Sequence, residues 1–435
     1  MISLSTEQIN QLAPDSASIS AARGLASKWQ LLGGNDAALW GLCKGSGKNP
    51  YQTVIAAGDL VSKCSCPSRK FPCKHALSLL QVASANPEKI MAAESPDWVQ
   101  AWLDKRSSAQ EAKAARAEAK ASKAADPKQQ QKTAAARAKK VSAGLADLQL
   151  WLQDLLRNGI IHTDNQRGEA FPAMAKRLVD AQLAPLAQEL QRLALLPAGQ
   201  QEELLYGLSK LHLLARSYAN QEQLSPAWQA EIKTRLGFPQ AKEEILAGAA
   251  VADRWRVVGR LELEQQRGTS LHYYLFGLET KRFALLLDFT MNNVPPTLPP
   301  LAVGTHYDAE LCFYAGINPL RALPKTLNFN EEALPLAAPA EPLQETWAGA
   351  QQAIAANPFL GHWPLWLRGV HYVQRGEAGG LSDGRQVLPL ALNPNEKIQL
   401  LASSSGGRAG SAFVLHNFND GRNRLLSFLP EAAHA

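Results

Sequence analysis

Four metal-ligand side chains within a stretch of twelve residues constrain this chain more than any other feature of its sequence. In Lys63–Leu80 they follow the pattern C-x-C-x6-C-x-H, formed by Cys64, Cys66, Cys73 and His75. Structural zinc sites take four thiolate or imidazole ligands in a tetrahedron. Side chains in a strand repeat every second residue, so a C-x-C pair on a strand directs both thiolates to one face. We therefore predict one structural Zn²⁺ on these four residues, with no open position for catalysis.

The neighbouring residues predict a small antiparallel sheet whose end the zinc ion joins to a helix. Pro72 suits the first turn of that helix, where its missing N–H costs little. GSGK, within the Lys44–Pro50 turn, is not a phosphate loop, because Leu42 and Asn49 stand where that motif needs Gly and Ser or Thr. The predicted elements are a helix at Ala21–Trp29, strands at Ala38–Cys43, Tyr51–Ala57 and Asp59–Cys66, and helices at Lys74–Ala83 and Pro96–Lys105.

Other roles for the thiols are less consistent with the sequence. The N-terminus has no basic segment and carries Glu7, so it predicts no secretory signal, a cytoplasmic location and no disulfides. The C-x-C spacing also differs from the C-x-x-C of thioredoxin-like redox sites. We expect Cys43 and Cys312 to be small core residues. No apolar run approaches the length of a membrane span.

The metal-ligand pattern resembles the SWIM-type zinc finger, and the residues around it resemble a bacterial SWIM family. The likeness is carried by WGLCKGSGKNPY at Trp40–Tyr51, by CPSRKFPCKHALSLL, and by PDWVQAWLDKR at Pro96–Arg106. It is strong over the first hundred residues and loose beyond them. The resemblance implies a zinc module that contacts DNA or protein. It also implies an accessory role beside MoxR-like AAA ATPases and von Willebrand A proteins, with which relatives of this type are associated.

Positive charge is concentrated in one tract. Residues 105–140 carry 11 Lys+Arg and 3 Asp+Glu, whereas residues 141–435 carry 25 and 28. The tract is rich in alanine and has no large apolar side chain to bury, so it reads as a solvated, partly helical tether. The alternative is a polybasic arm whose contacts with phosphate groups would be salt-sensitive.

Beyond the tract, the hydrophobic period indicates first helices and then strands. Leucines at helical spacing from Leu145 to Leu156 begin an all-helical region of about five helices. From about Arg254 the period approaches two, which predicts an antiparallel sheet or small barrel. The fold class is therefore α+β and multidomain. We expect a SWIM-type domain at residues 1–106, a basic linker at 107–140, a helical domain at 141–250 and an α+β domain at 251–435.

Within the last region we predict strands at the positions where alternation is clearest, and one helix. The strands are Trp255–Glu264, Leu271–Leu278, Phe283–Phe289, His306–Tyr314, Gln386–Leu392, Ile398–Ala402, Ala412–Leu415 and Leu425–Leu429, and the helix is Leu343–Ala356. The segment Ser403–Ser411 reads as a hairpin loop, although its amides could also cradle an anion. No catalytic motif is present, and the histidines are scattered.

The sequence thus favours a non-enzymatic zinc-binding protein that contacts nucleic acid or a protein partner. A basic edge would carry the contact, with Arg69, Lys70 and Lys74 on the finger and Lys44 and Lys48 on the facing turn. The alternative for these side chains is local compensation of the net negative charge of a Zn(Cys)3His centre. The alternative function is an enzyme with its site in the C-terminal α+β region.

Overall fold

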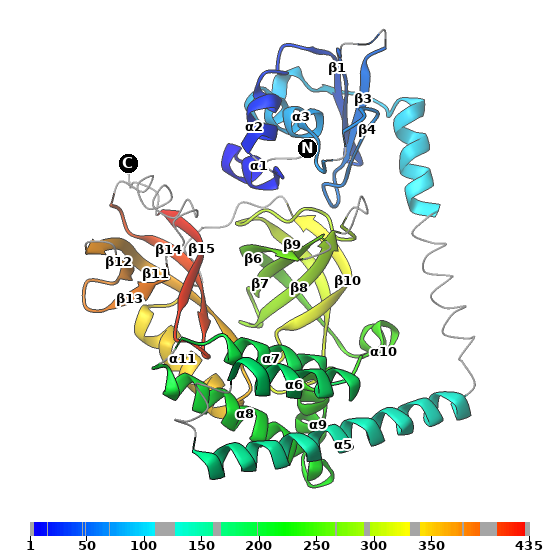
Figure 1. Ribbon diagram of the computed structural model, residues 1–435. Helices are drawn as coiled ribbons and strands as arrows, with labels where there is room; N and C mark the ends of the chain where they lie inside the picture. Colours follow the sequence, from blue (N-terminus) through cyan, green and yellow to red (C-terminus); the bar gives the residue numbers. More distant parts are fainter. Residues whose placement is uncertain are drawn as a thin grey trace.

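The computed structural model describes residues 4–430 apart from 15, 46, 48, 69, 109–126, 160–166, 198, 266–267, 291–295, 331–339, 376–377 and 392–406. The described residues form three β-sheets and a group of packed helices, which confirms the predicted multidomain α+β class (Figure 1). Lys48, Arg69, half of the basic tract, the strand predicted at Ile398–Ala402 and part of the Ser403–Ser411 loop lie outside the described residues.

Residues 4–108, here called the finger module, contain a five-stranded sheet covered on both faces. The strand order is β4-β3-β2-β1-β5, antiparallel except for the pair β1 and β5. The elements are α1 (Thr6–Leu12), α2 (Ser16–Arg23), β1 (Trp29–Gly34), β2 (Ala38–Cys43), β3 (Tyr51–Ala56), β4 (Ser62–Cys64), α3 (Lys74–Ala85), η1 (Pro87–Lys89), β5 (Met91–Ala92) and a helix over residues 97–108.

The alternation of side chains along β2 and β3 explains the two covered faces. Leu39 and Ile55 point to the face on which α1 and α3 pack. Their neighbours Trp40 and Val54 point to the opposite face, where Val99 of the helix over 97–108 covers them. A strand buried on both faces reads as a continuous apolar run, as ALWGLC does.

The predicted helix at Ala21–Trp29 is wrong beyond Arg23. Helix α2 ends at Arg23, and Trp29 begins β1. The Trp29 indole donates a hydrogen bond to the Ser78 hydroxyl of α3, 3.1 Å away. This long-range contact fixes an extended backbone at Trp29, and a local helical period cannot anticipate it.

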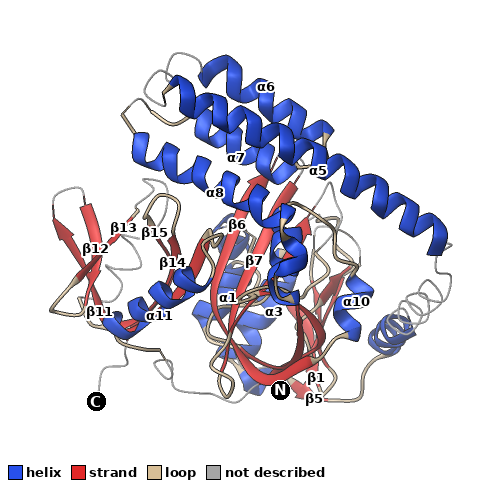
Figure 2. Cartoon of the chain, turned by 90° about the horizontal axis from the view of Figure 1, so that it is seen from below, coloured by secondary structure: helices blue, strands red, loops and turns tan. Residues whose placement is uncertain are grey.

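The helical region comprises α5 (Pro127–Asn158), α6 (Arg167–Asp180), α7 (Ala184–Ala194), α8 (Gln201–Ala219), η3 (Gln221–Gln223), α9 (Pro226–Arg235) and α10 (Lys242–Ala247). Helices α5 to α8 lie side by side along one side of the molecule (Figure 2). In α5 the buried positions Val141, Leu145, Leu148, Leu152 and Leu155 recur every three or four residues, as expected for one packed stripe. Helix α5 begins well before residue 140, so the basic tract continues directly into it.

The predicted sheet or small barrel is a closed five-stranded barrel. Its strands are β6 (Ala250–Gln265), β7 (Gly268–Gly277), β8 (Phe283–Thr290), β9 (His306–Phe313) and β10 (Arg321–Asn330), in the order β10-β8-β7-β6-β9. The short parallel pairing of β10 with β8 closes it.

A third sheet follows the barrel. It comprises β11 (His362–Arg375), β12 (Ala378–Ser382), β13 (Val387–Leu390), β14 (Gly410–Asn417) and β15 (Asn423–Pro430), in the order β13-β12-β11-β14-β15, and α11 (Leu343–Ala356) packs on β11. Aromatic residues join this sheet to the barrel, since Tyr274 and Phe413 have ring centroids 5.3 Å apart. In the part of the chain that the structure describes, no helix is long and apolar enough to cross a membrane.

Candidate metal centre

Three thiols and one imidazole meet at the corner between β4 and α3. The donor atoms of Cys64, Cys66, Cys73 and His75 all lie within 4.8 Å of one another, and Cys64 Sγ is 3.7 Å from His75 Nδ1. A zinc tetrahedron with bonds of about 2.3 Å to sulfur has edges of about 3.8 Å between sulfur atoms. The donor types and their spacing therefore fit one zinc ion, as the C-x-C-x6-C-x-H pattern predicts.

The backbone brings the four donors together from two elements. Cys64 is the last residue of β4 and pairs with Thr53 of β3. Cys73 is the N-cap of α3, with φ −76° and ψ 166°, and His75 lies in the first turn. The prediction that one strand, Asp59–Cys66, carries both of the first thiols is wrong, because β4 ends at Cys64 and Cys66 lies in the bend that follows. This bend turns the chain from the sheet edge toward the helix.

The three thiols of the centre differ in pKa. A hydrogen bond from Cys73 lowers the pKa of Cys64 to about 4, and hydrogen bonds from His75 and Thr53 act in the same direction. The same Cys73–Cys64 hydrogen bond raises the pKa of Cys73, and burial raises the pKa of Cys66. Cys64 is thus the thiolate of the group, and a coordinated metal ion would deprotonate the other two.

Buried neighbours hold the ligands in place. The Thr53 hydroxyl is fully buried and donates a hydrogen bond to Cys64 Sγ over 3.2 Å. His75 is 3% exposed, and its ring lies against Tyr51 with centroids 4.9 Å apart. Polar and aromatic neighbours of this kind orient metal ligands and keep water from them.

A basic cleft opens beside the metal centre. It has a volume of about 940 Å³ and lies between α2, the end of β2, the start of β3 and the finger loop. Four lysines line it, Lys28, Lys44, Lys70 and Lys74, and no acidic residue is among the described residues of its wall. Cys66 and His75 also reach this wall, so the cleft borders the ligands themselves.

The cleft includes three of the five lysines and arginines predicted to form the basic edge. Lys44, Lys70 and Lys74 line it, whereas Lys48 and Arg69 are outside the described residues. Lys28 was missed, because it falls within the predicted helix Ala21–Trp29, whereas in the structure it lies directly before β1. The Lys44 amide donates a hydrogen bond to the Lys28 carbonyl over 2.8 Å, and this places the two lysines beside each other.

In the described residues, this is the one group of three or more His, Cys, Asp or Glu side chains with metal-ligand spacing. Among the described residues, two other histidines have a close side-chain partner. His416 Nδ1 is 2.8 Å from Asn423 Oδ1, and Ser270 Oγ and His272 Nε2 are 2.6 Å apart on β7. Ser270 is 1% exposed, so its hydroxyl is not presented to a substrate. The nearby Asp288 accepts hydrogen bonds from the Thr297 hydroxyl and the Leu298 amide.

Comparison with known proteins assigns two parts of the chain. Residues 50–84 match the family model of the SWIM zinc finger, and this range contains β3, β4, all four ligands and most of α3. Residues 136–236 match the SWIM-associated four-helix bundle domain, a range that begins within α5 and ends just after α9. No match was found among curated proteins or solved structures. The chain thus carries a SWIM zinc finger and, after it, a SWIM-associated four-helix bundle domain.

Proposed function

We propose that this protein is a non-enzymatic, zinc-stabilised binding protein whose finger module binds nucleic acid. The observation that carries the proposal is the basic cleft, in which four lysines from separate parts of the module line a wall without acidic residues. Lysines grouped in this way neutralise phosphate groups and release the counterions bound to them. The zinc ion has a structural role, because four protein ligands leave no position for a reacting water molecule.

The arrangement of the lysines supports a role in binding a partner, beyond compensating the negative charge of the metal centre. A Zn(Cys)3His centre carries a net negative charge that one nearby cation can offset. Four lysines exceed this requirement, and Lys28 belongs to the turn before β1 instead of the finger. Their side chains are exposed.

The test is a binding titration with the full chain. A fluorescently labelled single strand and a duplex of the same sequence are titrated at low and at physiological salt. We expect binding that weakens steeply with salt, with a slope in log K against log salt of about −0.7 to −0.9 for each phosphate contacted. The double variant Lys28→Ala/Lys44→Ala should bind at least several-fold more weakly.

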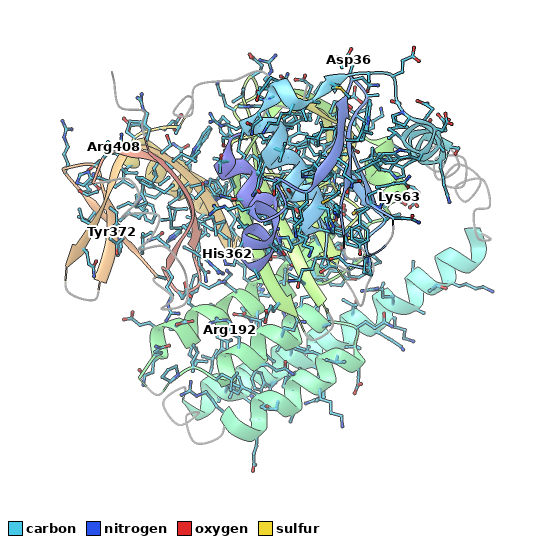
Figure 3. All side chains as sticks on the ribbon, turned by 90° about the horizontal axis from the view of Figure 1, so that it is seen from above. Asp36, Lys63, Arg192, His362, Tyr372 and Arg408 are labelled. Atoms are coloured by element: carbon cyan, nitrogen blue, oxygen red, sulfur yellow. The ribbon has the colours of Figure 1, made fainter. Side chains whose placement is uncertain are left out.

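The matched control is the double variant Lys63→Ala/Lys89→Ala. These lysines are exposed, belong to the same module and do not line the cleft, so the control removes the same charge elsewhere. Lys63 is labelled in Figure 3. Equal loss in both variants, or no binding of either probe at low salt, would refute nucleic-acid binding at the cleft.

In that event the remaining proposal is an acidic protein surface as the partner. The accessory role beside MoxR-like AAA ATPases would then be tested by capturing such an ATPase or a von Willebrand A protein with the full chain. We also propose that the protein works in the reducing cytoplasm, where thiols that ligate zinc stay reduced.

A further inference from the structure

We infer that the basic cleft accepts a single nucleic-acid strand in preference to a duplex, with phosphates on its lysine wall and bases against its α2 wall. The inference rests on the proposed function and specifies the form of nucleic acid. The observation behind it is that the two walls of the cleft differ in chemistry.

The α2 wall is mostly apolar. Ala17, Ala21 and Leu25 line it, at a spacing of four residues that places them on one face of the helix and the turn after it. Alanine side chains are short, so the helix surface here leaves room for a flat group to approach.

The lysine wall comes from the sheet and the finger. Lys28 and Lys44 are adjacent through their backbone hydrogen bond, and Lys74 lies at the start of α3. The lysines therefore come from the sheet, the finger and the turn before β1, whereas Ala17 and Ala21 come from α2.

A ligand that satisfies both walls carries negative charge along one edge and flat apolar groups along the other. A single strand has this character, since its bases are unpaired and free to contact protein. A duplex keeps its bases stacked and paired inside and presents phosphates and groove edges. It would leave the apolar wall uncovered. The volume of about 940 Å³ lies at the upper end of the range typical of small-ligand pockets, about 300–1,000 Å³, which suits a short run of nucleotides.

The test compares four labelled probes under one salt condition. They are an oligothymidylate about 12 nucleotides long, within the site sizes of about 4–16 nucleotides that single-strand-binding folds use, the matching oligouridylate, the duplex, and an abasic strand. We expect either base-bearing strand to bind about ten-fold or more tightly than the duplex and the abasic strand, because base contacts contribute about 1–3 kcal/mol each. The stronger of the two strands identifies DNA or RNA as the preferred source.

A second measurement tests whether the bases of the bound strand lie against α2. Ala21→Glu puts a carboxylate on the apolar wall at an exposed helix position, where glutamate is compatible with the helix. We expect about ten-fold or greater loss of strand binding with the zinc content unchanged. Ala17→Glu serves as a second variant should Ala21→Glu fail to fold.

The outcomes separate the inference from the function on which it rests. Equal binding of strand, duplex and abasic probe, all dependent on Lys28 and Lys44, overturns the single-strand inference and leaves nucleic-acid binding intact. A strand preference unaffected by both glutamate variants also overturns it. No binding of any probe refutes the proposed function itself.

Discussion

At the scale of single residues, Cys73 is the ligand whose loss tests the metal centre most directly. It is 6% exposed, caps α3 and hydrogen-bonds to the Cys64 thiolate. Replacing it with serine removes one soft ligand and separates β4 from the helix. We expect purified wild type to contain about one zinc ion per chain and Cys73→Ser to contain almost none, measured by elemental analysis.

The matched control for this change is Cys312→Ala. Cys312 is also a buried free thiol, but it lies on β9 of the barrel. We expect the control to keep its zinc. Because a structural zinc ion contributes about 10–16 kcal/mol of apparent binding free energy in isolated fingers, Cys73→Ser should also unfold the module at lower temperature. A full complement of zinc in Cys73→Ser would contradict the assignment.

Lys210 of α8 predicts a dependence of stability on pH. Burial lowers the pKa of Lys210 to about 8 from an ordinary value of 10.5, and the nearby positive charge of Arg235 adds to this. Its ammonium group still donates hydrogen bonds to the Leu360 carbonyl and to Asn419 Oδ1. Between about pH 8 and pH 10.5 the unfolded chain therefore holds more protons at this site, so rising pH favours the folded state.

Urea unfolding of wild type and Lys210→Met, measured from pH 7.5 to pH 10, isolates this effect. We expect the difference in unfolding free energy to move in favour of wild type as the pH rises, since methionine does not titrate. Lys233→Met, at an exposed position on α9, is the control for the loss of a lysine from the helical region. A difference for Lys210→Met that stays constant with pH would show that the lysine is not desolvated in the folded protein.

At the scale of elements, close packing between β6 and β14 makes Gly259 sensitive to substitution. A Cβ atom at this position would lie 2.6 Å from Cε1 of Phe413, and that ring is fully buried. Because the ring cannot move into solvent, the barrel and the third sheet would have to separate slightly. We expect Gly259→Ala to destabilise the protein by about 1–3 kcal/mol, measured by calorimetry.

Gly349 in α11 gives the opposite expectation and serves as the control. A Cβ atom there meets nothing within 4 Å, and the residue lies inside a helix. Gly349→Ala should stabilise the protein by about 0.5–1 kcal/mol, because alanine loses less conformational entropy in a helix. Equal effects of the two substitutions would contradict the packing seen between the barrel and the third sheet.

The elements that the sequence predicted well are those with a clear local period. The β2 strand and helix α11 agree with their predicted bounds, and the four zinc ligands follow from spacing alone. Strands β1, β5, β10, β11 and β12 were not predicted. Strand β11 contains Pro364, which lacks an amide hydrogen but still pairs with Leu415 of β14, and such a strand is held by partners distant in sequence. Lys28 was likewise not predicted as a site residue, because strand β1, which follows it, is held by partners distant in sequence.

At the scale of the whole molecule, the finger module rests on the barrel. The Phe329 amide of β10 donates a hydrogen bond to the Gly58 carbonyl over 2.7 Å, and Ala302 and Phe329 pack against the core of the module. The buried core of the bundle is a separate cluster. Among the described residues, its buried contributors from beyond α9 are Leu236, directly after that helix, and Phe359. The end of the basic tract is fixed to this bundle. Arg137 donates a hydrogen bond to the Gly237 carbonyl, and its guanidinium group lies over the Phe238 ring.

This arrangement predicts how the molecule responds when a chelator removes zinc. The metal centre joins β4 to α3. Loss of the zinc ion should therefore raise the amide hydrogen exchange rates in β3, β4 and α3 by more than about ten-fold. A smaller rise should reach β10, which contacts the module through Phe329. Helices α6 to α8 should exchange unchanged, because their core shares no residue with that of the module. Unchanged exchange in β4 and α3 would mean that packing alone holds the corner, and a rise across the bundle would mean that the two cores unfold together.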